Sequence, residues 1–121
     1  MKKKILIVDD DPRNIFALKL SLKARGFEIE SADSAQKAID LLKKNTDVDL
    51  VLMDMMMPEM DGYEAIKIIR KDQKINQLPV ISVTAQAMPE DFQKCIDAGA
   101  DDYVKKPVDM DILMSAIEKL I

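Results

Sequence analysis

Short apolar runs that alternate with helical patterns most constrain how this chain can fold. Leu50 to Met53 is too short for a helix, and its unbroken apolar character is typical of a strand buried on both faces. The runs at residues 3–9 and 79–84 have the same character, and apolar residues at helical spacing follow each of them. This alternation predicts an α/β fold with a doubly wound parallel sheet, right-handed crossovers and helices on both faces.

The sequence divides into five βα units. The second run, residues 27–32, alternates apolar and polar side chains and therefore predicts a half-buried strand near an edge. Gly26 and Gly99 end the first and fourth predicted helices. The predicted strands are residues 3–9, 27–32, 50–54, 79–84 and 102–105. The helix start signals are Asp11-Pro12, Ser34, Asp61 with Glu64, Pro89, and Asp109.

Length and charge limit the class of protein. We expect residues 1–121 to form one domain, since this length buries most of the surface that the unfolded chain exposes. With 22 acidic and 18 basic residues the net charge is -4, so nonspecific attraction to nucleic acid or an anionic membrane is not expected. No apolar stretch is long enough to span a membrane. The one cysteine, Cys95, fits a reducing compartment, and we expect a cytoplasmic location.

Polar residues follow four of the predicted strands at their carboxyl ends. Asp9 and Asp10 follow the first strand, and Asp54, Thr84 and Lys106 end or follow the third, fourth and fifth. In open α/β sheets the ligand crevice lies outside these strand ends, so the sequence predicts a site there.

Two neighbours of these residues are expected to stay outside the site. We interpret Asp11 as only a helix cap. Lys105 is expected to face solvent because side chains alternate along a strand and Lys106 is the lysine that precedes Pro107. A cis bond between Lys106 and Pro107 suits a tight turn, where such bonds are retained.

The residue types at this edge indicate phosphoryl chemistry. Three neighbouring carboxylates repel one another and need a cation, and hard oxygen ligands without histidine or cysteine select Mg²⁺ or Mn²⁺. Lys106 and the Thr84 hydroxyl can stabilise the oxygens of a phosphoryl group in transfer. An aspartate can itself accept the phosphoryl group as an aspartyl phosphate.

Four motifs, in order, carry a family resemblance. The sequences IVDDDP, VLMDMMMPEMDG, SVTA and DDYVKKP, which begin at residues 7, 51, 82 and 101, resemble the motifs of receiver domains from two-component response regulators. The resemblance runs from residue 5 to about residue 120. It implies a flavodoxin-like sheet with strand order 2-1-3-4-5, an order that general descriptions of this fold already assign to the family.

The resemblance also implies roles for the strand-end residues. Asp54 would accept a phosphoryl group from a phosphohistidine donor, and Asp9 and Asp10 would hold Mg²⁺ together with Asp54 and the Met56 carbonyl. Pro58 and Gly62 would shape the loop after Asp54.

The remaining implied roles concern switching and phosphoryl lifetime. Lys106 and Thr84 would contact the phosphoryl group. Thr84 and Tyr103 would then shift together and reshape the face formed by the fourth helix, fifth strand and fifth helix. Tyr103 alone is equally consistent with a core ring. Met56 and Gln86 would flank the attacking water, and an apolar Met56 offers no base, so we expect no strong acceleration of hydrolysis.

The expected partners follow from the same resemblance. A sensor histidine kinase or a His-containing phosphotransfer protein would donate the phosphoryl group, and a downstream protein would bind the reshaped face. The chain would be a signalling module that promotes its own phosphorylation, not a turnover enzyme. Docking would use residues at the start of the first helix and after the fifth strand: Arg13, Asn14, Ala17, Leu18, Pro107 and Val108.

Two alternatives remain open on the sequence. A phosphohydrolase of the haloacid dehalogenase type would use Asp9 as nucleophile and recruit Asp10, Asp11, Thr84, Lys106, Asp101 and Asp102. Arg13 stands where that family has threonine or valine, the chain is short for that fold, and Asp54 would have no role. The second alternative is a receiver-like interaction domain that acts without phosphorylation. A flavin-binding module is disfavoured because the turn after the first strand is acidic.

Overall fold

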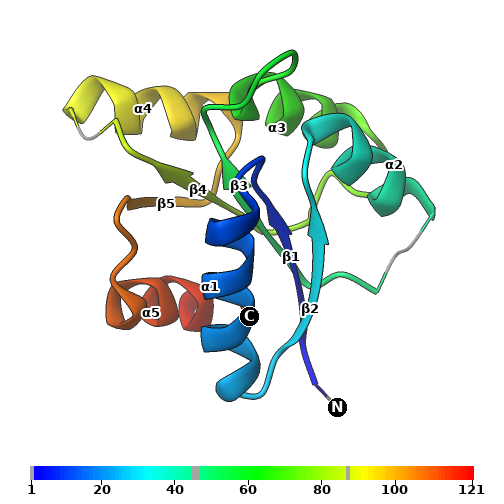
Figure 1. Cartoon of the computed structure of the whole chain (residues 1–121). Helices are drawn as coiled ribbons and strands as arrows, with labels where there is room; N and C mark the ends of the chain where they lie inside the picture. The colour runs from blue at the N-terminus through cyan, green and yellow to red at the C-terminus, as the bar shows by residue number, and fades with distance from the viewer. Residues whose placement is uncertain (1, 45–46, 87) are drawn as a thin grey trace.

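Five parallel strands form one sheet in the order β2-β1-β3-β4-β5 (Figure 1). The computed structural model describes residues 2–44, 47–86 and 88–121. The strand order and the parallel pairing confirm the predicted fold class. The strands are β1 (Lys4–Val8), β2 (Glu28–Ala32), β3 (Leu50–Asp54), β4 (Val80–Thr84) and β5 (Asp102–Lys105).

The helices begin at side-chain caps that the sequence predicts. Asp11 accepts from the Arg13 N–H, Asp61 from the Glu64 N–H, and Asp109 from the N–H groups of its own first turn. Each such cap satisfies a backbone donor that the helix leaves unpaired, for about 1 kcal/mol. The helices are α1 (Pro12–Ala24), α2 (Ala35–Lys44), α3 (Gly62–Lys71), α4 (Pro89–Ala98) and α5 (Met110–Leu120). None of the described helices is long and apolar enough to cross a membrane.

The sheet lies between two helical layers. α1 and α5 pack on one face, where Ile7, Leu52 and Ile81 join a cluster with Leu113. α2, α3 and α4 pack on the other face, around a cluster that includes Met53. Because β1, β3 and β4 are covered on both faces, their sequences are continuously apolar. β2, at the edge, is only half-buried, as its alternating sequence predicts. Fully burying one large aliphatic side chain contributes about 1.5–3 kcal/mol.

The strand register brings two acidic residues into neighbouring positions. Val8 at the end of β1 pairs with Met53 in β3. Asp9 and Asp54 are the next residues along these two adjacent strands, so both lie at the same edge of the sheet. The switch in strand order between β1 and β3 therefore produces the expected crevice at this edge.

Candidate functional site

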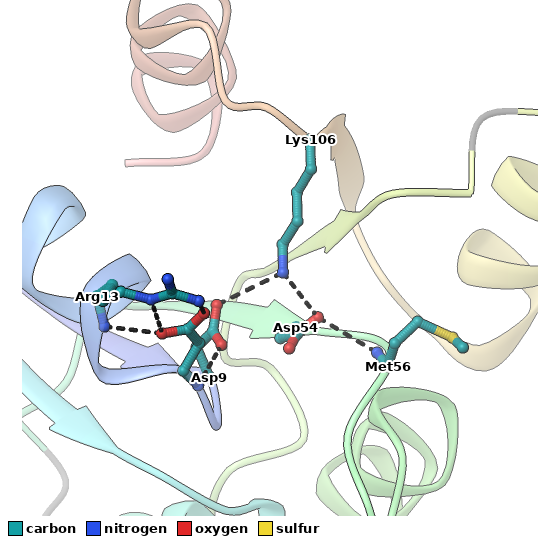
Figure 2. A network of polar contacts seen from close by, with 6 residues as sticks. Asp9, Arg13, Asp54, Met56 and Lys106 are labelled. Carbon is teal, nitrogen blue, oxygen red and sulfur yellow. Dashed lines mark hydrogen bonds and ion pairs between the residues drawn. The ribbon is translucent and has the colours of Figure 1, made fainter.

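Asp54 is the buried carboxylate at the centre of the strand-end cluster. It is the last residue of β3 and is only 4% exposed. Its Oδ1 atom lies 3.2 Å from Lys106 Nζ and accepts a hydrogen bond of the same length from the Met56 N–H (Figure 2). One carboxylate oxygen thus has two donors, one from β5's carboxyl end and one from the loop after β3.

Asp9 and Asp10 complete the acidic cluster from the end of β1. Asp9 is buried, its Oδ1 accepts from the Asp11 N–H at 2.9 Å, and its Oδ2 lies 3.5 Å from Lys106 Nζ. Asp10 is exposed, and one oxygen from each of Asp9, Asp10 and Asp54 lies within 4.8 Å of the others. A compact donor set made only of carboxylate oxygens is suited to a hard divalent cation.

The negative charges of the strand-end cluster outnumber the positive charge beside them. Burial raises the pKa of Asp54 above its ordinary value of 3.8, and the charge of Asp9 raises it further, while the Met56 N–H and Lys106 oppose this rise. Three carboxylates thus face one ammonium group in this structure. A cation added at this place would favour the ionised form of Asp54.

Thr84 and Lys106 are linked through the backbone. Thr84 is fully buried at the end of β4, its Oγ1 accepts from the Gln86 N–H at 3.1 Å, and its carbonyl accepts from the Lys106 N–H at 2.8 Å. The Lys106–Pro107 bond is cis, as the sequence allows. Lys105 is exposed, as expected, and Lys106 is the lysine whose Nζ lies beside Asp9 and Asp54.

Gly62 fixes the loop that follows Asp54. A Cβ atom at Gly62 would lie 2.7 Å from both the Asp54 carbonyl oxygen and Met55 Cα, which is closer than real Cβ contacts allow. The Gly62 N–H donates to the Met55 carbonyl at 3.2 Å. The Met56 side chain points outward and is 54% exposed. Only glycine therefore permits α3 to begin directly against the end of β3.

Tyr103 lies at the surface, so its interpretation as a core ring is wrong. The ring is 36% exposed and stacks on Phe92 of α4, with 4.0 Å between centroids and 9° between planes. Sequence reasoning assigned no role to Phe92. With only five aromatic residues in the chain, an aromatic in each of two adjacent elements was a usable signal for this pair.

Five of the six predicted docking residues line one groove of about 550 Å³. The groove also contains Asp9 and Lys106, so it leads to the acidic cluster. Arg13 is not among its lining residues, and its exposed guanidinium pairs with Asp11 at 3.1 Å. The predicted docking residues that the structure brings together are Asn14, Ala17, Leu18, Pro107 and Val108.

Asp101 and Asp102 lie at the opposite end of the sheet, which removes them from the phosphohydrolase scheme. Asp102 is the first residue of β5, and Asp101 Oδ2 accepts from the Val80 N–H at 2.8 Å and from Arg70 at 2.9 Å. Arg70 also donates to three backbone carbonyls, those of Asn76, Leu78 and Gly99. Sequence reasoning missed this arginine, whose partners are mostly backbone atoms with no signature in the sequence.

Comparison with known proteins agrees with this geometry. The family model for the response regulator receiver domain matches residues 5–118. A probable cyclic di-GMP phosphodiesterase of Vibrio cholerae is 42% identical over 93% of this chain and 25% of its own length. A two-component response regulator of Oryza sativa subsp. indica is 33% identical over 86% of both chains. A putative response regulator from Chloroflexus aurantiacus superposes with a TM-score of 0.94, at 31% identity over 99% of this chain and 98% of that one.

The relatives place the same module in proteins of different size. The chain spans a quarter or less of the first curated relatives, which include the sensor histidine kinase RcsC of Salmonella typhimurium, matched over 12% of its length. The part shared with these relatives covers 93% to 98% of this chain. The chain belongs to the family of response regulator receiver domains, the phosphoryl-accepting signalling modules of two-component systems.

Proposed function

We propose that residues 1–121 are one receiver domain that accepts a phosphoryl group on Asp54. The observation that carries this proposal is the buried Asp54 carboxylate, held 3.2 Å from Lys106 Nζ with two further aspartates beside it. A buried nucleophile beside a cation and a metal-binding acidic set is what phosphoryl transfer to a carboxylate requires. The domain acts as a cytoplasmic signalling module and not as a turnover enzyme.

The acidic cluster fits Mg²⁺, with Mn²⁺ as a substitute. Asp9, Asp10 and Asp54 would hold the ion together with the Met56 carbonyl, since all four supply oxygen ligands. When bound, the ion supplies positive charge for the phosphoryl oxygens. A bound cation would offset the burial and the Asp9 charge that raise the pKa of Asp54.

The transfer step uses the geometry around Asp54. A free carboxylate oxygen of Asp54 attacks the phosphorus of a phosphohistidine, the P–O bond forms, and the P–N bond breaks to release the imidazole. Lys106 neutralises charge on the phosphoryl oxygens, and the Thr84 hydroxyl donates to one of them. The histidine belongs to a sensor kinase or phosphotransfer protein that docks in the groove beside Lys106.

Phosphorylation would then reach the α4, β5 and α5 face through Thr84 and Tyr103. Thr84 turns toward the phosphoryl group, and Tyr103 leaves Phe92 and follows it inward, which changes the face that a downstream protein binds. Met56 and Gln86 flank the water that ends the signal. The exposed, apolar Met56 provides no base, so we expect no strong acceleration of hydrolysis from this position.

The experiment is phosphorylation with acetyl phosphate and Mg²⁺, followed by mass spectrometry of the labelled peptide. We expect label on Asp54, no label in Asp54→Asn or in EDTA, and full label in the exposed control Asp40→Asn. Label on Asp9 that survives Asp54→Asn would overturn the proposal in favour of the phosphohydrolase chemistry.

A second measurement tests the conformational change. Beryllofluoride and Mg²⁺ mimic the phosphoryl group, and we expect them to shift the amide resonances of Thr84, Tyr103 and the α4, β5 and α5 face. Unchanged spectra, with no label from acetyl phosphate, would indicate an interaction domain that acts without phosphorylation.

A further inference from the structure

Helix α1 has two apolar stripes, and only one of them faces the sheet. Leu22 is fully buried and packs with Ile15 and Leu18 in the core on this face. Phe16 and Leu20, spaced i and i+4, form a second stripe that is 68% and 63% exposed. A surface helix ordinarily has one apolar stripe, so the second one is a candidate contact surface for another molecule.

A groove lies beside this outer stripe. It has a volume of about 640 Å³ and is formed by α1 on one side and by the end of β2, Asp33 and α2 on the other. Ile15 and Phe16 line it from α1, and Ala32 and Leu41 line it from the opposite wall. Figure 1 shows α1 and α2 on either side of β2, the edge strand, so the groove runs over a free edge of the sheet. It shares no lining residue with the groove at Lys106.

The charged residues of α1 are all basic, and the one carboxylate that lines the groove, Asp33, is already paired with Lys37 at 3.0 Å. α1 contains Arg13, Lys19 and Lys23 and no acidic residue, although the net charge of the protein is -4. Arg13 is already paired with Asp11. Within the described parts of the chain, no carboxylate forms an ion pair with Lys19 or Lys23. These two lysines lie at i+3 and i+7 from Phe16, on the same side of the helix.

We propose that this face of α1 docks an acidic amphipathic helix of a partner protein. Apolar side chains of the partner cover Phe16 and Leu20 and enter the groove, and its carboxylates pair with Lys19 and Lys23. A second copy of this chain is a poorer occupant, because a symmetric contact through α1 would bring two basic surfaces together. The interaction is independent of the phosphoryl transfer proposed above, since none of the strand-end residues takes part.

The test is a titration of the ¹⁵N-labelled protein with a designed peptide, followed by NMR. The peptide has about 18 residues, with leucines at helical i, i+3, i+4 and i+7 spacing and glutamates elsewhere. A second peptide carries lysines in place of the glutamates. We expect the acidic peptide to shift the amides of Phe16, Lys19 and Leu20 and those of the groove wall saturably, and to bind at least tenfold tighter than the basic one.

Two variants make the test specific to this surface. The double substitution Phe16→Ser with Leu20→Gln is expected to weaken binding at least tenfold, while labelling by acetyl phosphate stays unchanged. Ile112→Gln, which changes an equally exposed apolar residue on α5, should bind as the parent does. Absence of saturable shifts, equal affinity for the two peptides, or shifts confined to α4, β5 and α5 would overturn the proposal. Self-association of the protein in sedimentation experiments would also overturn the proposal if the double substitution removes it. That result would identify a second copy of this chain as the occupant.

Discussion

At the carboxyl end of the sheet one ammonium group pairs with two of three clustered carboxylates, whereas at the amino end one arginine is surrounded by acceptors. Lys106 Nζ lies 3.2 Å from Asp54 and 3.5 Å from Asp9. Arg70 donates to Asp101 and to three backbone carbonyls, and Asp101 also accepts from the Val80 N–H. The same types of charged group thus stabilise the fold at one end and remain available for chemistry at the other.

The polar groups that stabilise the fold and those that form the site thus lie at opposite ends of the strands. Polar atoms at the amino end have protein partners, so their removal leaves unpaired acceptors and costs stability. The carboxylates at the carboxyl end repel one another, so the removal of one relieves the fold while it destroys the site. Natural proteins commonly retain such unfavourable groups where function needs them.

The largest effect on stability is expected from Gly62→Ala. This substitution tests whether backbone atoms are closely packed at the carboxyl end of the sheet. The new Cβ would meet the Asp54 carbonyl oxygen and Met55 Cα at 2.7 Å, and we expect a loss of about 3 kcal/mol in the free energy of unfolding. Urea denaturation measures it. Gly26→Ala is the control: no atom lies within 4 Å there, and only its positive φ costs about 1 kcal/mol. Equal losses in the two variants would contradict the close approach at Gly62.

Arg70→Met tests the amino end of the sheet. The substitution leaves Asp101 and three backbone carbonyls without the arginine donor. We therefore expect the free energy of unfolding to fall by about 2 kcal/mol. Labelling of the folded protein by acetyl phosphate should not change. Lys71→Met, at the neighbouring exposed position, should have the stability of the parent chain. A slower labelling rate in Arg70→Met would show that the amino end of the sheet also affects the chemistry at the carboxyl end.

Asp54→Asn should change the free energy of unfolding in the opposite direction. We expect this free energy to rise by about 1 kcal/mol at pH 7 without metal. Burial raises the pKa of Asp54 above 3.8, so the folded protein binds this proton more tightly than the unfolded chain does. The resulting stability is present below pH 3.8 and is lost as the pH rises through the folded pKa. The gain of the variant should therefore shrink on acidification from pH 7, as thermal melts in EDTA would report. A loss of stability at pH 7 would show that the Lys106 contact dominates.

The smallest effect is expected from Lys106→Met, measured as Mg²⁺ affinity by calorimetry. Removal of the ammonium group leaves the three carboxylates more negative, so Mg²⁺ should bind about threefold tighter, although labelling slows. Lys105→Met, which changes an exposed neighbour, should leave the affinity as it is. Weaker binding in Lys106→Met would mean that the lysine organises the carboxylates and does not compete with the ion.

The sequence predicted the parts of the fold that depend on local chemistry. The caps at Asp11, Asp61 and Asp109 are local hydrogen bonds, and apolar runs identify buried strands without knowledge of their neighbours. Parallel strands alone place Asp9 and Asp54 at the same edge of the sheet. That they lie side by side depends on the strand order, which came from the resemblance to a known family because crossover lengths do not determine it.

Contacts between distant residues could not be predicted in the same way. Arg70 looks like any basic residue in the last turn of a helix. Its partners are mostly backbone carbonyls, which every residue type carries, so the sequence does not reveal them. Arg13 was expected among the docking residues, but it does not line the groove that the other five share, and its guanidinium pairs with the neighbouring Asp11. The Phe92 and Tyr103 stack depends on how α4 lies beside β5, which is a property of tertiary packing.

The contact at Gly62 also has a mechanical consequence. There is no free space between the first turn of α3 and the end of β3, and the Gly62 N–H donates to the Met55 carbonyl, so we expect these two elements to move together. If Asp54 is the phosphoryl acceptor as proposed, we expect strain from the new group to act on Thr84 and Lys106, whose backbones are joined by a hydrogen bond of 2.8 Å. The molecule would then have a stiff side at α3 and a compliant side at Thr84 and Lys106.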